Sequence, residues 1–88
     1  YWIGESLAAQ ALHADARRRF LEVAQAYPGS AKVPDAVLRA ALEAVELGQL
    51  DDAIRELRQL VAAHANSDAA LIGCMQLDRL GQPLPAGC

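Results

Sequence analysis

The chain has 88 residues and a net charge of −3, with acidic and basic residues mixed along its length. This balance excludes the basic face of a nucleic-acid-binding protein, and no apolar run reaches the roughly 18–20 residues that span a bilayer. Hydrophobic residues make up 53% of the sequence but aromatic residues only 5%, because much of the apolar content is alanine. Since alanine is the strongest helix former, we expect one small all-α domain.

Two helices are predicted in the first unit, which covers about residues 1–30. The first helix runs over about residues 1–11 and the second over about residues 14–27, where Pro28 prevents the helix from continuing. Apolar residues of the second helix recur at the spacing of one helical face and should be buried. They are Ala16, Phe20, Val23 and Tyr27.

A second unit covers about residues 34–66 and also contains two predicted helices. The third helix starts at Pro34 and ends before Gly48, which suits the left-handed conformation that closes a helix. The fourth helix runs over about residues 50–64, with two aspartates beside the positive end of its dipole. Its predicted core residues are Ala53, Leu57, Leu60 and Val61.

A fifth helix, over about residues 67–80, is predicted to cap the two units. Ser67 is a favourable N-cap residue. Glycine and proline residues then end regular structure, which predicts a flexible tail over residues 81–88. Cys74 fits a buried thiol, and a disulfide to Cys88 is the alternative, which requires an oxidising compartment.

The two units align when the sequence is shifted by 37 residues. Such a period, with two helices per unit, is the signature of a helical solenoid. Small residues recur where paired helices would cross closely. The coinciding pairs are Gly4 and Ala41, Asp15 and Asp52, Ala16 and Ala53, Arg18 and Arg55, Phe20 and Leu57, Val23 and Leu60, Ala26 and Ala63, and Ser30 and Ser67.

Both units resemble the tetratricopeptide repeat. At the characteristic positions of that repeat the first unit has Gly4, Ala16, Phe20 and Pro28, and the second has Ala41, Gly48, Ala53 and Leu57. Ala65 replaces the closing proline of the second unit, and Ala11 replaces the usual glycine between the helices of the first. The resemblance implies an all-α solenoid of helical hairpins, with two repeats plus a C-terminal capping helix, that binds proteins.

Residues 1–80 further resemble the C-terminal repeat domain of the Tol-Pal accessory family, known as YbgF or CpoB. The resemblance is carried by YWIGES at residues 1–6 and by YPGSAKVPDAVL at residues 27–38. It implies a periplasmic adaptor of Gram-negative bacteria. The implied partner is TolA, and the implied role is to coordinate outer-membrane constriction with peptidoglycan synthesis at cell division.

In the repeat pattern, the first helix of each unit lines a concave face that binds partners. The residues predicted to point into it are Tyr1, Glu5, Ala9, Asp35, Leu38, Leu42, Val45 and Glu46. Leu38, Leu42 and Val45 form an apolar stripe on a side that the core of the second unit does not need. The fifth helix, a neighbouring unit or a second copy of the chain could cover this stripe, and so could a peptide or helix from a partner.

The chain opens inside an amphipathic pattern without a helix cap before Tyr1, which predicts that it is part of a longer protein. Without a preceding repeat, the first helix would expose apolar residues such as Trp2 and Ile3. We therefore expect self-association or exchange of a helix between copies.

Motifs for catalysis or for a cofactor are lacking. His13 and His64 are single residues without metal-ligand spacing, and the run from Arg17 to Arg19 fans around a helix as a solvated face would. Neither a nucleophile motif nor a glycine-rich phosphate loop is present. We expect no enzyme activity, metal or cofactor.

Overall fold

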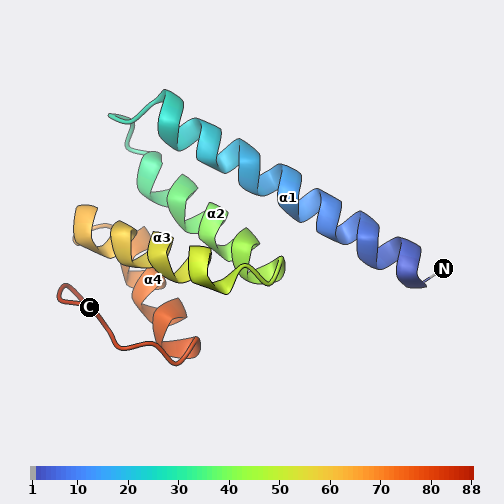
Figure 1. The fold of residues 1–88 in the computed structure, drawn as a ribbon. Helices are drawn as coiled ribbons and strands as arrows, with labels where there is room; N and C mark the ends of the chain where they lie inside the picture. The colour runs from blue at the N-terminus through green and yellow to red at the C-terminus, as the bar shows by residue number, and fades with distance from the viewer. Residues whose placement is uncertain (1) are drawn as a thin grey trace.

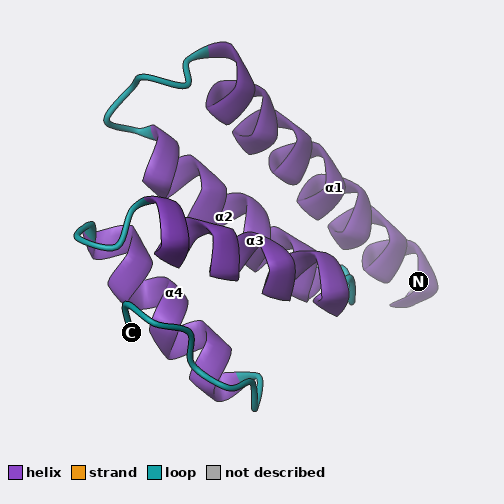
Figure 2. Ribbon diagram, turned by 60° about the vertical axis from the view of Figure 1, so that its left-hand side comes forward, coloured by secondary structure: helices purple, strands orange, loops and turns teal. Residues whose placement is uncertain are grey.

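A computed structural model describes the backbone of residues 2–88 and the side chains of residues 10–88. The described part contains helices and no strand, which confirms the all-α prediction. The helices are α1 (Trp2–Ala26), α2 (Val33–Glu46), α3 (Leu50–Ala63) and α4 (Asp68–Arg79) (Figure 1). The hairpin of α2 and α3 lies between α1 and α4 (Figure 2).

The central helix is α2, which contacts each of the other three helices. It begins with Pro34 in its first turn and ends before Gly48, whose φ of 77° is left-handed and lets the chain turn back into α3. Both features were predicted. Three alanines of α2 are completely buried and allow its neighbours to approach closely, namely Ala40, Ala41 and Ala44.

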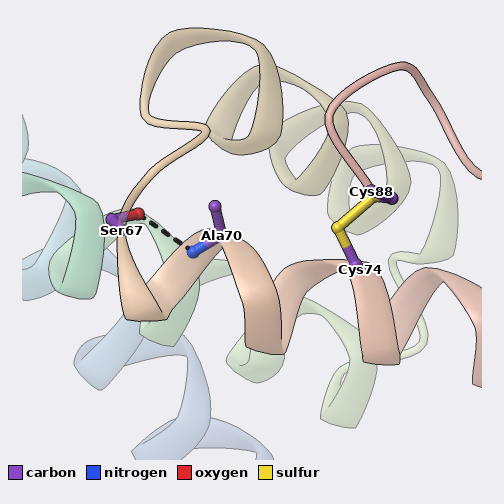
Figure 3. Close-up of a disulfide and its surroundings, with 4 residues drawn as sticks. All are labelled: Ser67, Ala70, Cys74 and Cys88. Atoms are coloured by element: carbon purple, nitrogen blue, oxygen red, sulfur yellow. Dashed lines mark hydrogen bonds between the residues drawn. A yellow bond between two sulfur atoms is a disulfide. The ribbon is translucent and has the colours of Figure 1, made fainter.

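The main hydrophobic core lies where α2, α3 and α4 meet. It contains Leu38, Ala41, Leu57, Leu60, Ala69 and Leu77. The four core residues predicted on α3 are each at most 1% exposed, so their prediction is confirmed. At Gly73, α4 lies directly against α3, because a Cβ atom there would lie in van der Waals contact with Leu60 Cδ2 at 3.4 Å. The predicted cap of α4 is also present, since Ser67 Oγ accepts a hydrogen bond of 3.0 Å from the Ala70 N–H (Figure 3).

The prediction of two helices in the first unit is wrong. The helix α1 runs without a break through the expected turn and is 25 residues long. The reason lies at Ala11, which occupies the position of Gly48 in the 37-residue alignment. A residue with a Cβ atom pays about 1–2 kcal/mol in the left-handed conformation that Gly48 adopts, whereas alanine favours the helix.

Because α1 does not fold back on itself, its predicted core residues are only partly covered. Ala16 and Phe20 are half-buried, Val23 is 37% exposed and Tyr27 is 66% exposed. The predicted burial of Val23 and Tyr27 is therefore wrong. The Arg39 guanidinium from α2 lies 5.9 Å from the centre of the Phe20 ring.

The tail after α4 contains no helix or strand but is anchored to the domain. Cys74 and Cys88 form a disulfide with their Cα atoms 5.7 Å apart (Figure 3). Gly87 rests against α3, because a Cβ atom there would lie 3.3 Å from Val61 Cγ1. The expectation of a free, buried Cys74 thiol is therefore wrong, and the bridge joins the predicted flexible segment to the core.

We predict that Ala53→Leu destabilises the domain by about 1–3 kcal/mol, because the larger side chain overpacks a fully buried position between α3 and its neighbours. Urea unfolding would measure the change. Ala62→Leu is the matched control, since Ala62 is exposed on the same helix. Equal stability of the two variants would contradict the tight packing of α3.

We also predict that Cys74→Ala/Cys88→Ala lowers the free energy of unfolding by about 3 kcal/mol, the value expected for a bridge that closes a loop of this size. Reduction of the wild-type chain should give the same loss. Identical unfolding midpoints of the oxidised and reduced chains would show that the bridge does not stabilise the fold.

Candidate functional site

A continuous groove follows α2 and α4, the first helices of successive helical pairs. It consists of three adjoining hollows of about 490, 380 and 340 Å³. Gln76 and Arg79 line both the first and the second hollow, and Ile72 lines both the second and the third. We call this surface the α2–α4 groove. A row of adjoining hollows along two helices suits an extended peptide or a helix better than a compact small molecule.

The floor of the α2–α4 groove is apolar and comes from both helices. Leu42 and Val45 of α2 are half-buried, so each presents part of its side chain to solvent. On α4, Ile72 is 41% exposed and Met75 is 62% exposed. When a partner covers partly exposed aliphatic side chains on two adjacent helices, the burial of apolar surface lowers the free energy of the complex.

The rim of the α2–α4 groove carries charges of both signs. Glu43 and Glu46 of α2 face the same hollow as Arg79 of α4. His13 of α1 closes this end, because its Nδ1 atom pairs with the Glu43 carboxylate. Such a rim favours a partner with complementary charges at both edges and an apolar centre.

The structure brings together only part of the predicted concave set. Leu42, Val45 and Glu46 line the hollow of about 490 Å³, and Asp35 lines the hollow at the other end of α2. Asp35 also accepts a hydrogen bond of 3.1 Å from Arg39 Nε. These four residues line hollows of the α2–α4 groove, and their binding of a partner stays a prediction.

Leu38 does not face the groove, which corrects the prediction. Its side chain is 4% exposed and belongs to the core cluster that includes Ala69 and Leu77 of α4. Of the candidates for covering the apolar stripe, the fifth predicted helix, observed as α4, covers its first residue. A repeat pattern assigns a face to a residue, but only the position of the next helix decides whether that residue is accessible.

The other predicted residues belong to the start of the chain. Tyr1 and the side chains of Glu5 and Ala9 lie outside the described residues. The backbone of positions 5 and 9 belongs to α1, whose N-terminal half projects beyond the end of α2 (Figure 1). A closed first hairpin would place these two positions beside Leu42 and Val45. The continuous α1 does not.

The α4 side of the groove was missed by the sequence analysis. Ile72, Met75 and Arg79 lie on α4 at spacings of three and four residues, which places them along one stripe. The buried residues of α4 form a different stripe, namely Ala69, Ala70, Gly73 and Leu77. Two stripes on one short helix indicate a second contact surface, and this signal was available in the sequence.

Arg17 joins the three helices α1, α2 and α3, which also was not predicted. Its guanidinium donates hydrogen bonds of 2.8 and 2.7 Å to the Glu56 carboxylate and one of 3.0 Å to the Ala40 carbonyl. Both charged side chains are only 13% exposed. The assignment of residues 17–19 to a solvated face is therefore wrong for Arg17, although Arg18 and Arg19 are exposed and pair with Asp15.

The hydrogen bonds that Arg17 donates to the Glu56 carboxylate raise the pKa of Arg17, and partial burial opposes this effect. An arginine with a raised pKa stays charged over the whole working range of pH. The positive charge that Arg17 contributes to this ion pair is therefore constant over that range.

Within the described side chains, no group of three histidine, cysteine or acidic residues could hold a metal ion. No helix in the described part of the chain is long and apolar enough to cross a membrane.

The fold and the groove define a solenoid of helical hairpins, a class of protein whose repeats generally bind other proteins and lack catalysis. The model of the tetratricopeptide repeat matches residues 1–30 and 35–67, and the chain belongs to this family. No curated protein and no solved structure matches the chain.

We predict that Arg17→Met and Glu56→Gln each destabilise the domain by about 1–3 kcal/mol, since each leaves a largely buried charge without its partner. A double-mutant cycle by urea unfolding should give a coupling energy above about 1 kcal/mol. The exposed pair of Arg55 and Asp52 is the control and should couple by less. Equal coupling of both pairs would contradict a structural role for Arg17.

Proposed function

We propose that this domain is an adaptor that holds a peptide or an amphipathic helix of another protein in the α2–α4 groove. Membership of the tetratricopeptide repeat family supports protein binding as the general function. The observation that carries the proposal is the row of partly exposed apolar residues in adjoining hollows, with Leu42 and Val45 of α2 in one hollow and Ile72 and Met75 of α4 in the next.

We further propose that the domain works in the periplasm as an adaptor of the YbgF or CpoB type, with a TolA-like partner. Its role would be to link envelope constriction to peptidoglycan synthesis at cell division. Two sequence stretches support this proposal, at residues 1–6 and 27–38. The disulfide between Cys74 and Cys88 also supports it, because such bonds persist in the periplasm and are rare in the cytosol.

The shape and charge of the groove define what its ligand should look like. Apolar residues spaced by three or four positions on one face of a helix would rest on the floor between α2 and α4. A basic residue would pair with Glu46, and an acidic residue would pair with Arg79 on the opposite side. Rim pairs of this kind orient a ligand and speed its association more than they add to affinity.

We predict saturable binding when this domain is titrated with the soluble helical and C-terminal parts of TolA. Leu42→Glu/Val45→Glu should weaken binding by at least about tenfold, because two charges would replace the apolar floor. Leu50→Glu is the matched control, since Leu50 is 45% exposed on α3 and does not line the groove. Circular dichroism would confirm that all three chains keep their helix content.

Binding that survives Leu42→Glu/Val45→Glu would contradict the α2–α4 groove as the binding site. If the wild type does not bind TolA, the proposal of a Tol-Pal partner fails. A mass above one chain that falls only in this double variant would instead assign the groove to self-assembly of a structural scaffold.

A further inference from the structure

Equivalent residues of the two repeats differ sharply in burial. In the 37-residue alignment, Ala16, Phe20, Val23 and Ala24 of α1 correspond to Ala53, Leu57, Leu60 and Val61 of α3. The four residues of α3 are at most 1% exposed. Those of α1 are all partly exposed, and Val23 reaches 37%. We call the four residues of α1 the open face.

The difference arises because the open face lacks one of its two covering helices. The buried face of α3 packs between α2, the first helix of its own repeat, and α4, the first helix of the next. For the C-terminal half of α1, the next repeat supplies α2. The first helix of its own repeat should come from residues 1–11, which the family match includes.

Those residues cannot cover the open face of their own chain in this conformation. They continue α1 as one helix and project away from α2 (Figure 1). Gly4 corresponds to Ala41, which packs in one cluster with Leu57, the counterpart of Phe20. Along a helix, residues 4 and 20 are about 24 Å apart, so this contact cannot form within one continuous α1.

The conformation of Ala11 explains why the first repeat stays open. In the closed hairpin of α2 and α3, the equivalent Gly48 has a φ of 77°. Ala11 disfavours that conformation and favours the helix. Both effects lower the free energy of the open form relative to the closed hairpin. In the open form, the backbone of residues 2–10 therefore lies away from the open face, and α2 is the helix that contacts α1 among the described residues.

We propose that residues 2–10 of a second copy occupy the open face of α1, by exchange of this segment between chains. The second copy is the fitting occupant because its segment is the counterpart of α2, which makes the same contact in the second repeat. Each copy offers one segment and one open face, so the exchange can be reciprocal or can pass along several copies. It does not depend on what binds the α2–α4 groove.

The first test is the mass of the 88-residue chain by light scattering over a wide range of concentrations. A single chain has a mass of 9.4 kDa, and exchange gives twice this value or more. Val23→Glu should return the chain to one copy, because it places a charge on the open face. Leu71→Glu should leave the mass unchanged, since Leu71 is 64% exposed on α4 and outside the open face.

The second test acts on the turn. Ala11→Gly should raise the dissociation constant of the assembly by roughly tenfold for each exchanged segment, because glycine weakens the continuous helix and permits the closed hairpin. Ala14→Gly is the matched control. It weakens the same helix, but its counterpart Asp51 is helical in the second repeat, so it cannot restore the turn.

The proposal is supported if Val23→Glu and Ala11→Gly both shift the chain toward one copy and the two controls do not. A mass of one chain at every concentration would overturn it. An assembly lost in Leu71→Glu but kept in Val23→Glu would overturn the open face as the interface. Equal effects of Ala11→Gly and Ala14→Gly would overturn the exchange of residues 2–10.

Discussion

The structure depends on the close approach of neighbouring helices to α2. This helix contacts the other three, and its alanines at positions 40, 41 and 44 are completely buried. Larger side chains would push the neighbours away and open the core. The same approach brings the Ala40 carbonyl within reach of Arg17, which ties α1 to α3 through Glu56. Small residues on one helix thus position the core, a largely buried ion pair and the groove that α2 shares with α4.

One repeat in this chain is closed and the other is open, and the difference lies in backbone conformational energy. Gly48 turns the chain with a positive φ, whereas Ala11 keeps the helix going. A difference of about 1–2 kcal/mol per residue is comparable to the net contribution of a single hydrogen bond, so it decides between conformations only where packing does not. In the second repeat, α4 completes a core that favours the closed form. The N-terminal half of α1 instead projects beyond the end of α2 (Figure 1).

Two surfaces of the domain therefore have different physical roles. The α2–α4 groove has partly exposed apolar residues beside charges of both signs and suits a partner with an apolar centre and charged edges. The open face of α1 is the complement of a segment that the chain itself encodes. The fold alone does not identify a partner for either surface, because tetratricopeptide repeats present similar grooves to many proteins. The disulfide between Cys74 and Cys88 holds the tail against α4 and does not define a ligand.

The sequence by itself determined the fold class, the 37-residue repeat and the limits of α2, α3 and α4. These limits depend on local signals such as Pro34, Gly48 and Ser67, which act on the backbone within one turn. The repeat pattern of the sequence also assigned Leu42, Val45 and Glu46 to the face of α2 that lines the groove. Only the tertiary structure decided that α1 is continuous, that α4 buries Leu38, that Arg17 pairs with Glu56 and that the tail is bonded to α4. Each of these outcomes depends on residues distant in the chain, whose contacts have free energies that local patterns do not contain.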